Sequence, residues 1–85
     1  MNHVSLIIKY SNYIAKARAV TRVWNRQNPD RIAPWEYVEE ACLAHFHIME
    51  CPPGPEMTMY VNKYNEFARK LPKDLLLLVF DYYTK

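Results

Sequence analysis

The chain has 85 residues, of which 51% are hydrophobic and 14% aromatic, and its formal net charge is +2 at pH 7. This length allows one domain with one modest core, and the apolar content excludes an intrinsically disordered chain. One glycine stands against six prolines, which argues against tight β-hairpins and favours helices separated by prolines. The composition therefore predicts an all-α fold, a compact single domain of three to four helices over residues 1–85.

The cysteines and the apolar segments indicate the cellular compartment of the protein. Two cysteines, Cys42 and Cys51, are too few for the disulfide framework of a small secreted protein. The sequence shows no basic segment followed by an apolar one, as in a signal peptide. Its longest apolar run, Leu75 to Phe80, falls far short of the ~20 residues of a membrane span. We expect an intracellular protein, in the cytoplasm or a host-cell interior, that does not contact a membrane.

The first segment, over residues 3–27, has the apolar spacing of an amphipathic helix. The residues that share one side of this helix are Leu6, Ile7, Tyr10, Tyr13, Ile14, Ala17, Val20 and Trp24. The alternation of Val4, Leu6, Ile8 and Tyr10 also fits a strand over residues 3–10. The longer pattern favours the helix.

A second helix is predicted over residues 34–50, after the break at Asn28-Pro29-Asp30. Pro34 suits the first helical position, where its missing N–H costs nothing. Apolar residues lie on two sides of this helix: Trp35, Cys42, Phe46 and Met49 on one, and Val38, Ala41, Ala44 and Ile48 on the other. Such a helix is usually packed between others, so we expect it at the centre of the fold.

A third helix, over residues 56–71, follows the linker Pro52-Pro53-Gly54-Pro55, where consecutive prolines disfavour helical backbone. Its apolar stripe is the clearest in the sequence. The stripe consists of Met57, Tyr60, Val61, Tyr64, Phe67, Ala68 and Leu71. Pro72 is expected to end this helix, which we expect to pack against the second.

The last segment, over residues 73–83, begins with the helix-start signal of Pro72 and Asp74. Its apolar run also permits a buried strand, since a short run does not distinguish the two. As a helix it would be apolar on nearly every side, and such a helix is either central to the core or covered by a partner. The residues that we predict to bind a protein partner or a second copy are Leu76, Val79, Phe80, Tyr82 and Tyr83.

The stretch from Leu71 to Tyr83, with its Leu-Pro pair, paired leucines, apolar-Phe pair and Tyr, resembles the opening helix of an F-box. That module docks proteins onto a ubiquitin-ligase adaptor, so the resemblance implies protein binding. An F-box continues with further helices, for which the residues after Tyr83 are too few. We therefore assign no family from this stretch.

The charges are unevenly distributed. Residues 1–35 carry six Lys or Arg against Asp30, whereas residues 36–56 carry five Glu and no Lys or Arg. The two segments either pair with each other or form two binding faces. The basic residues that would contact nucleic-acid phosphates in the second case are Lys16, Arg18, Arg22 and Arg26.

No metal site, cofactor site or catalytic site is predicted. Cys42 and His45 lie one helical turn apart, but His47 points away from His45, so four zinc ligands do not converge. A Cys/His nucleophile would need a concave pocket and an oxyanion hole, which so small a helical domain rarely offers. We therefore expect a non-enzymatic protein.

These observations favour a protein–protein interaction module. Such a chain would act as a small stoichiometric regulator or inhibitor that occludes a macromolecular partner, as viral and phage accessory proteins often do. A protein partner of unknown identity is expected, with a homodimer possible. The alternative is a small nucleic-acid-binding protein that uses the basic face of the first helix.

Overall fold

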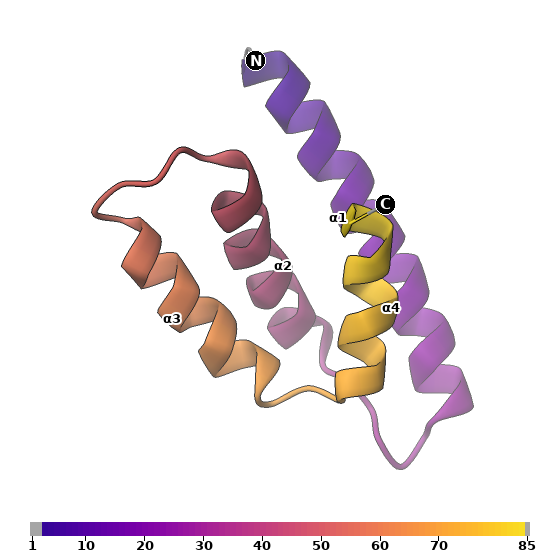
Figure 1. The fold of residues 1–85 in the computed structure, drawn as a ribbon. Coiled ribbons are helices and arrows are strands. Elements are labelled where there is room, and N and C mark those ends of the chain that lie inside the picture. The colour runs from indigo at the N-terminus through magenta and orange to yellow at the C-terminus, as the bar shows by residue number, and fades with distance from the viewer. Residues whose placement is uncertain (1–2, 85) are drawn as a thin grey trace.

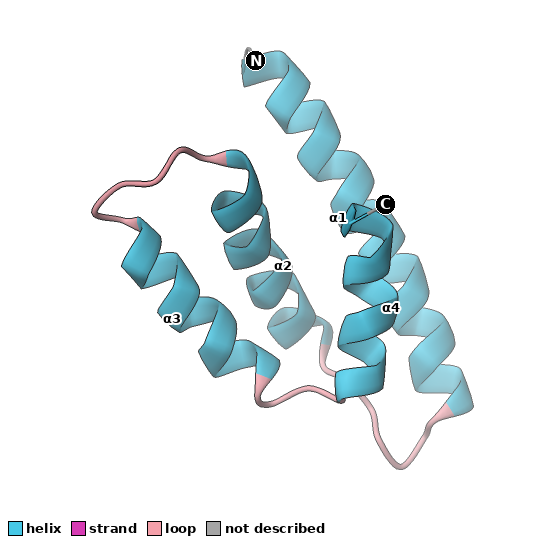
Figure 2. Cartoon of the chain, viewed as in Figure 1, coloured by secondary structure: helices cyan, strands magenta, loops and turns pink. Residues whose placement is uncertain are grey.

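The computed structural model describes residues 3–84, with the side chains of residues 4–80. It is all-helical over this range, with no strand (Figure 2). The helices are α1 (His3–Gln27), α2 (Trp35–Glu50), α3 (Met57–Ala68) and α4 (Lys73–Thr84). The all-α prediction is confirmed, and the strand alternatives for residues 3–10 and for the Leu75–Phe80 run are wrong.

Each helix runs roughly opposite to the one before it (Figure 1). α2 packs between α1 and α3, and α4 lies along α1. α1 is the longest helix, and its N-terminal half extends beyond α4 (Figure 1). The domain has extents of 39 × 25 × 21 Å. Within it, α4 covers only the C-terminal half of α1 (Figure 1).

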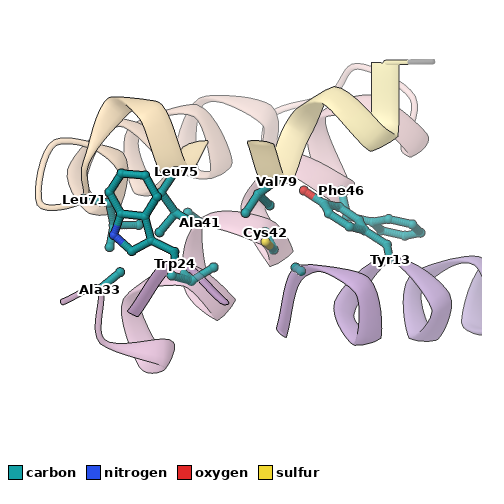
Figure 3. Close-up of a cluster of buried hydrophobic side chains, with 11 residues drawn as sticks. Tyr13, Trp24, Ala33, Ala41, Cys42, Phe46, Leu71, Leu75 and Val79 are labelled. Carbon is teal, nitrogen blue, oxygen red and sulfur yellow. The ribbon is translucent and has the colours of Figure 1, made fainter. Parts of the chain in front are cut away.

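The core joins α1, α2 and α4 (Figure 3). Tyr13 and Phe46 lie at one end of it and Trp24 and Leu71 at the other, with Cys42 between them (Figure 3). Its deepest members come from α1, the α1–α2 connection, α2 and α4, and those of α2 are small or β-branched. The residues at most 2% exposed are Tyr13, Ala17, Ala33, Val38, Ala41, Cys42, Ala44, Leu75 and Val79. Small side chains on α2 let its neighbours approach closely, which places this helix at the centre.

The α1–α2 connection is held by side chains from the end of α1 and from the connection itself. The indole Nε1 of Trp24 donates to the carbonyl oxygen of Arg31 at 3.0 Å, and the Asn28 side chain donates to the carbonyl oxygen of Trp24 at 3.0 Å. Pro34 is the N-cap of α2, so the first helical residue is Trp35, one residue after the position that the sequence suggested. Its extended backbone leaves its carbonyl oxygen to accept from the backbone N–H groups of Tyr37 and Val38.

α3 ends at Ala68, three residues before the predicted end at Leu71. Residues 69–71 continue as a turn, in which the N–H of Leu71 donates to the carbonyl oxygen of Ala68 at 3.2 Å. The cause is Pro72, which disfavours helical backbone in the residue before it. The turn places Leu71 in the core at 6% exposure.

Three residues predicted on apolar stripes are exposed instead. Ile7 is 64% exposed on α1, Met49 52% on α2 and Val61 38% on α3. Ile7 lies in the half of α1 that extends past α4 (Figure 1), and α3 packs mainly against α2 and has no fully buried residue. Within the described part of the chain, none of the helices combines the length and the apolar character that crossing a membrane requires.

Candidate interaction surfaces

α4 has an inner side in the core and an outer side that is exposed. Leu75 and Val79 are fully buried, at 0% and 2%, so Val79, a predicted contact residue, is a core residue. The other predicted contacts on this helix, Leu76 and Phe80, are half-buried. Tyr82 and Tyr83 lie outside the residues whose side chains are described.

Phe80 packs inward, toward α2 and α3. Its ring centroid lies 4.4 Å from that of His45 and 5.5 Å from that of Tyr64. Leu76 borders a shallow polar depression between α3 and α4, together with Asn65 and Lys73. Neither residue therefore offers an extended apolar surface to a partner.

The exposed leucines of α4 are not among the predicted contact residues. Leu77 is 71% exposed and Leu78 is 55% exposed. No signal in the sequence distinguishes them, because the run from Leu75 to Phe80 is apolar at every position. The spacing therefore does not show which side of this helix faces the core.

Leu78 forms one wall of a groove between α1 and α4, here called the α1/α4 groove, with a volume of about 390 Å³. Its other lining residues all come from α1: Lys16, Ala19, Val20, Val23, Trp24 and Gln27. Five of the seven lining residues are apolar or aromatic, and Val23 is 42% exposed. The groove is open to solvent.

The α1 side of the groove carries basic residues. Lys16 lines the groove itself, and Arg26 lies three residues from Val23, on the adjoining surface of α1. Residues 1–29 contain no Asp or Glu, so the charged side chains that α1 contributes to this region are all positive. On α4, Asp74 stands four residues before Leu78 and thus lies on the same side of that helix. The α1/α4 groove thus combines an apolar floor with a positive border on α1.

The four basic residues predicted to contact nucleic acid lie on two different sides of α1. Arg18, Arg22 and Arg26 are exposed and follow one another at four-residue spacing along α1. Lys16, two residues before Arg18, lies on nearly the opposite side of the helix and borders the groove. Arg18 is also engaged, because its guanidinium lies 5.4 Å from the centre of the Trp35 ring.

The acidic segment pairs with lysines instead of the arginine series. Lys9 of α1 forms an ion pair with Glu50 at the end of α2, and Lys63 of α3 lies 2.6 Å from Glu40 of α2. No ion pair of Arg22 or Arg26 is found among the side chains of residues 4–80. The basic segment (residues 1–35) and the acidic segment (residues 36–56) therefore pair through Lys9 and Glu50, and this pairing does not involve Arg22 or Arg26.

The cysteines and histidines form two separate groups. Cys42 is fully buried, and burial raises the pKa of its thiol to about 12. Burial lowers the pKa of His45, whose Nδ1 lies 3.3 Å from the hydroxyl oxygen of Tyr13. On another side of α2, Cys51 Sγ and His47 Nδ1 lie 3.5 Å apart. Over residues 4–80, no group of three His, Cys, Asp or Glu residues could hold a metal ion.

A second exposed apolar region lies at the N-terminal end of α1. Val4 and Ile7 are each 64% exposed and Ile8 is 55% exposed. The total accessible area of 5872 Å² exceeds the roughly 5300 Å² expected for a compact monomer of this length by about one tenth. The chain thus presents slightly more surface than a compact monomer of its size, and exposed large apolar side chains occur on all four helices.

Comparisons of the chain with protein-family models, with curated proteins and with solved structures found no match.

Proposed function

We propose that this chain is a non-enzymatic protein-binding module that docks an acidic amphipathic helix of its partner in the α1/α4 groove. The observation that carries the proposal is an open apolar groove with the exposed Leu78 on its α4 wall. Leu78 is 55% exposed and faces Val23, which is 42% exposed, across the groove, and clustered apolar side chains of this kind supply contact area that is desolvated on binding.

The chemistry of the occupant follows from the charge around the groove. A helix fits a groove between two helices when it presents apolar residues along one face. Arg26, for which no ion pair is found among the side chains of residues 4–80, favours Asp or Glu at the edge of that face and disfavours a basic ligand. Binding of this kind would make the chain a stoichiometric regulator that occludes the partner's helix.

The alternative function is nucleic-acid binding by the arginine series. The observation that favours it is the absence of acidic residues from positions 1–29, with Arg22 and Arg26 exposed on α1. Phosphate contacts of this kind weaken steeply as salt increases. Contacts in an apolar groove depend much less on salt.

A library of displayed helical peptides with acidic, neutral and basic variants tests the proposal. Selected peptides are then measured by fluorescence anisotropy against the wild type, Leu78→Asp and the control Thr58→Asp, an exposed position on α3. We expect selection of acidic amphipathic peptides, at least tenfold weaker binding by Leu78→Asp and unchanged binding by the control.

Peptides that bind Leu78→Asp as well as the wild type would contradict docking in the α1/α4 groove. A fluorescent DNA duplex and an RNA hairpin serve as competing probes. Tight binding to either, lost in Arg22→Glu and at high salt but retained in Leu78→Asp, would establish the nucleic-acid function instead.

A further inference from the structure

The end of α2 carries a cysteine and a histidine whose donor atoms are held close together. Cys51 follows His47 by one helical turn, and its backbone N–H donates to the carbonyl oxygen of His47 at 3.0 Å. The Sγ and Nδ1 atoms of the two side chains lie 3.5 Å apart. The imidazole stacks on the ring of Tyr60 from α3, with centroids 4.2 Å apart and planes 7° from parallel. The α2–α3 packing thus fixes the orientation of the ring.

The separation of the two donor atoms fits a tetrahedral zinc ion. Zinc binds thiolate sulfur at about 2.3 Å and imidazole nitrogen at about 2.0–2.1 Å. At the tetrahedral angle these bonds place sulfur and nitrogen about 3.5–3.6 Å apart. The pair therefore already has the length of one edge of the coordination tetrahedron, without a change of side-chain position.

Among the side chains of residues 4–80, the chain supplies only this edge, because no third His, Cys, Asp or Glu joins a metal-binding group with the pair. Structural zinc requires four protein ligands, and a two-fold axis through the ion would double two ligands to four. A dimer with that symmetry uses the same surface of both copies.

The surface around the pair is open to a second molecule. The pair borders a pocket of about 150 Å³ that Pro52, Gly54 and Glu56 also line. Residues 52–56 are exposed, and no atom lies within 4 Å of the position that a Cβ of Gly54 would occupy. A second copy can therefore approach this connection without displacing packed side chains.

We propose that His47 and Cys51 form a zinc half-site, which two copies of the chain join to make one Cys₂His₂ centre and a metal-dependent homodimer. On binding, each Cys51 thiol loses its proton to solvent and coordinates as thiolate, while each His47 coordinates as neutral imidazole through Nδ1. The site lies at the α2–α3 connection and does not include the α1/α4 groove. It therefore stands independently of the proposed protein-binding function.

Cobalt titration of the tag-free, reduced protein tests the site. Co²⁺ reports tetrahedral thiolate ligation through its charge-transfer and d–d absorption, and Zn²⁺ then displaces it. We expect saturation at one metal per two chains, with loss of the absorption in Cys51→Ser and in His47→Gln. The control Cys42→Ala, which removes the buried thiol, should retain it.

Sedimentation velocity with Zn²⁺ and with EDTA measures the second half of the proposal. We expect the mass to double with Zn²⁺ in the wild type and in Cys42→Ala, and to remain that of the monomer in Cys51→Ser. Circular dichroism establishes that each variant is folded. A wild type without thiolate absorption, one that binds one metal per chain as a monomer, or one that dimerises equally in EDTA would overturn the shared site.

Discussion

Asn25 and Ala33 are joined by two hydrogen bonds that close the α1–α2 connection. The side-chain amide of Asn25 donates to the carbonyl oxygen of Ala33 at 3.1 Å, and its Oδ1 accepts from the backbone N–H of Ala33 at 2.8 Å. Ala33 is 1% exposed, so water cannot replace these bonds. One side chain thereby satisfies both backbone groups of a buried residue that precedes α2.

Asn25→Ala should therefore reduce the free energy of unfolding by about 1–3 kcal/mol, the cost of leaving buried polar groups without partners. Asn12→Ala, the same change at an exposed position of α1, should change it by less than about 0.5 kcal/mol. Urea denaturation followed by tryptophan fluorescence measures both. Asn25→Asp separates the two bonds, because aspartate accepts from the N–H but repels the carbonyl oxygen. An Asn25→Asp variant as stable as the wild type would contradict the two-bond arrangement.

Leu75 and Leu77 provide a matched pair on α4. Leu75 is fully buried and Leu77 is 71% exposed, although they stand two residues apart in the same apolar run. Leu75→Ala should lower the free energy of unfolding by about 2–5 kcal/mol, since it removes buried methyl groups and leaves a cavity. Leu77→Ala should change it by no more than about 0.5 kcal/mol. Equal losses in urea denaturation would show that α4 packs with a different side toward α1.

The α4 leucines also show what the sequence could not predict. The proline positions and the helical spacing were enough to predict four helices, with α2 at the centre. In a run that is apolar on all sides, however, periodicity does not identify the inner face. Helical spacing therefore does not predict the exposure of Leu77 and Leu78, and the predicted contact residue Val79 belongs to the core. Which face of α4 is buried depends on where α1 lies in the fold.

Ile7 and the His47–Cys51 pair show two other limits of the sequence. The spacing of Ile7 places it near the apolar stripe of α1, but spacing does not tell how far a neighbouring helix extends, and α4 does not reach this part of α1 (Figure 1). His47 and Cys51 stand four residues apart, a spacing that brings side chains together on a helix. Because Tyr60 comes from another helix, its stacking on His47 was not visible in the sequence.

His45 should make the stability depend on pH. Burial lowers its pKa in the folded protein below the ordinary value of 6.5, so the unfolded chain binds the proton more readily. The free energy of unfolding should therefore be larger near pH ~7.5 than near pH ~5, with the decrease beginning as the pH falls through the unfolded-state pKa. His45→Gln should reduce this difference, whatever its effect on stability at neutral pH. Urea denaturation at both pH values measures it, and an unchanged difference in the variant would exclude His45 as its source.

The two cysteines should react with alkylating reagents at very different rates. Cys42 is 0% exposed and the pKa of its thiol is raised to about 12, so at pH ~8 only about one thiol in ten thousand would be ionised. Cys51 is half-buried beside an open pocket. Iodoacetamide should therefore modify one thiol per chain in the native protein, at Cys51, and both thiols in denaturant. Mass spectrometry of the intact and of the digested protein measures the modification.

Cys42 lies on α2 and is buried in the core with residues of α1 and α4, so its reaction under native conditions would require the core to open. Rapid native modification of Cys42 would thus contradict both its burial and the close packing of α2 at the centre of the fold.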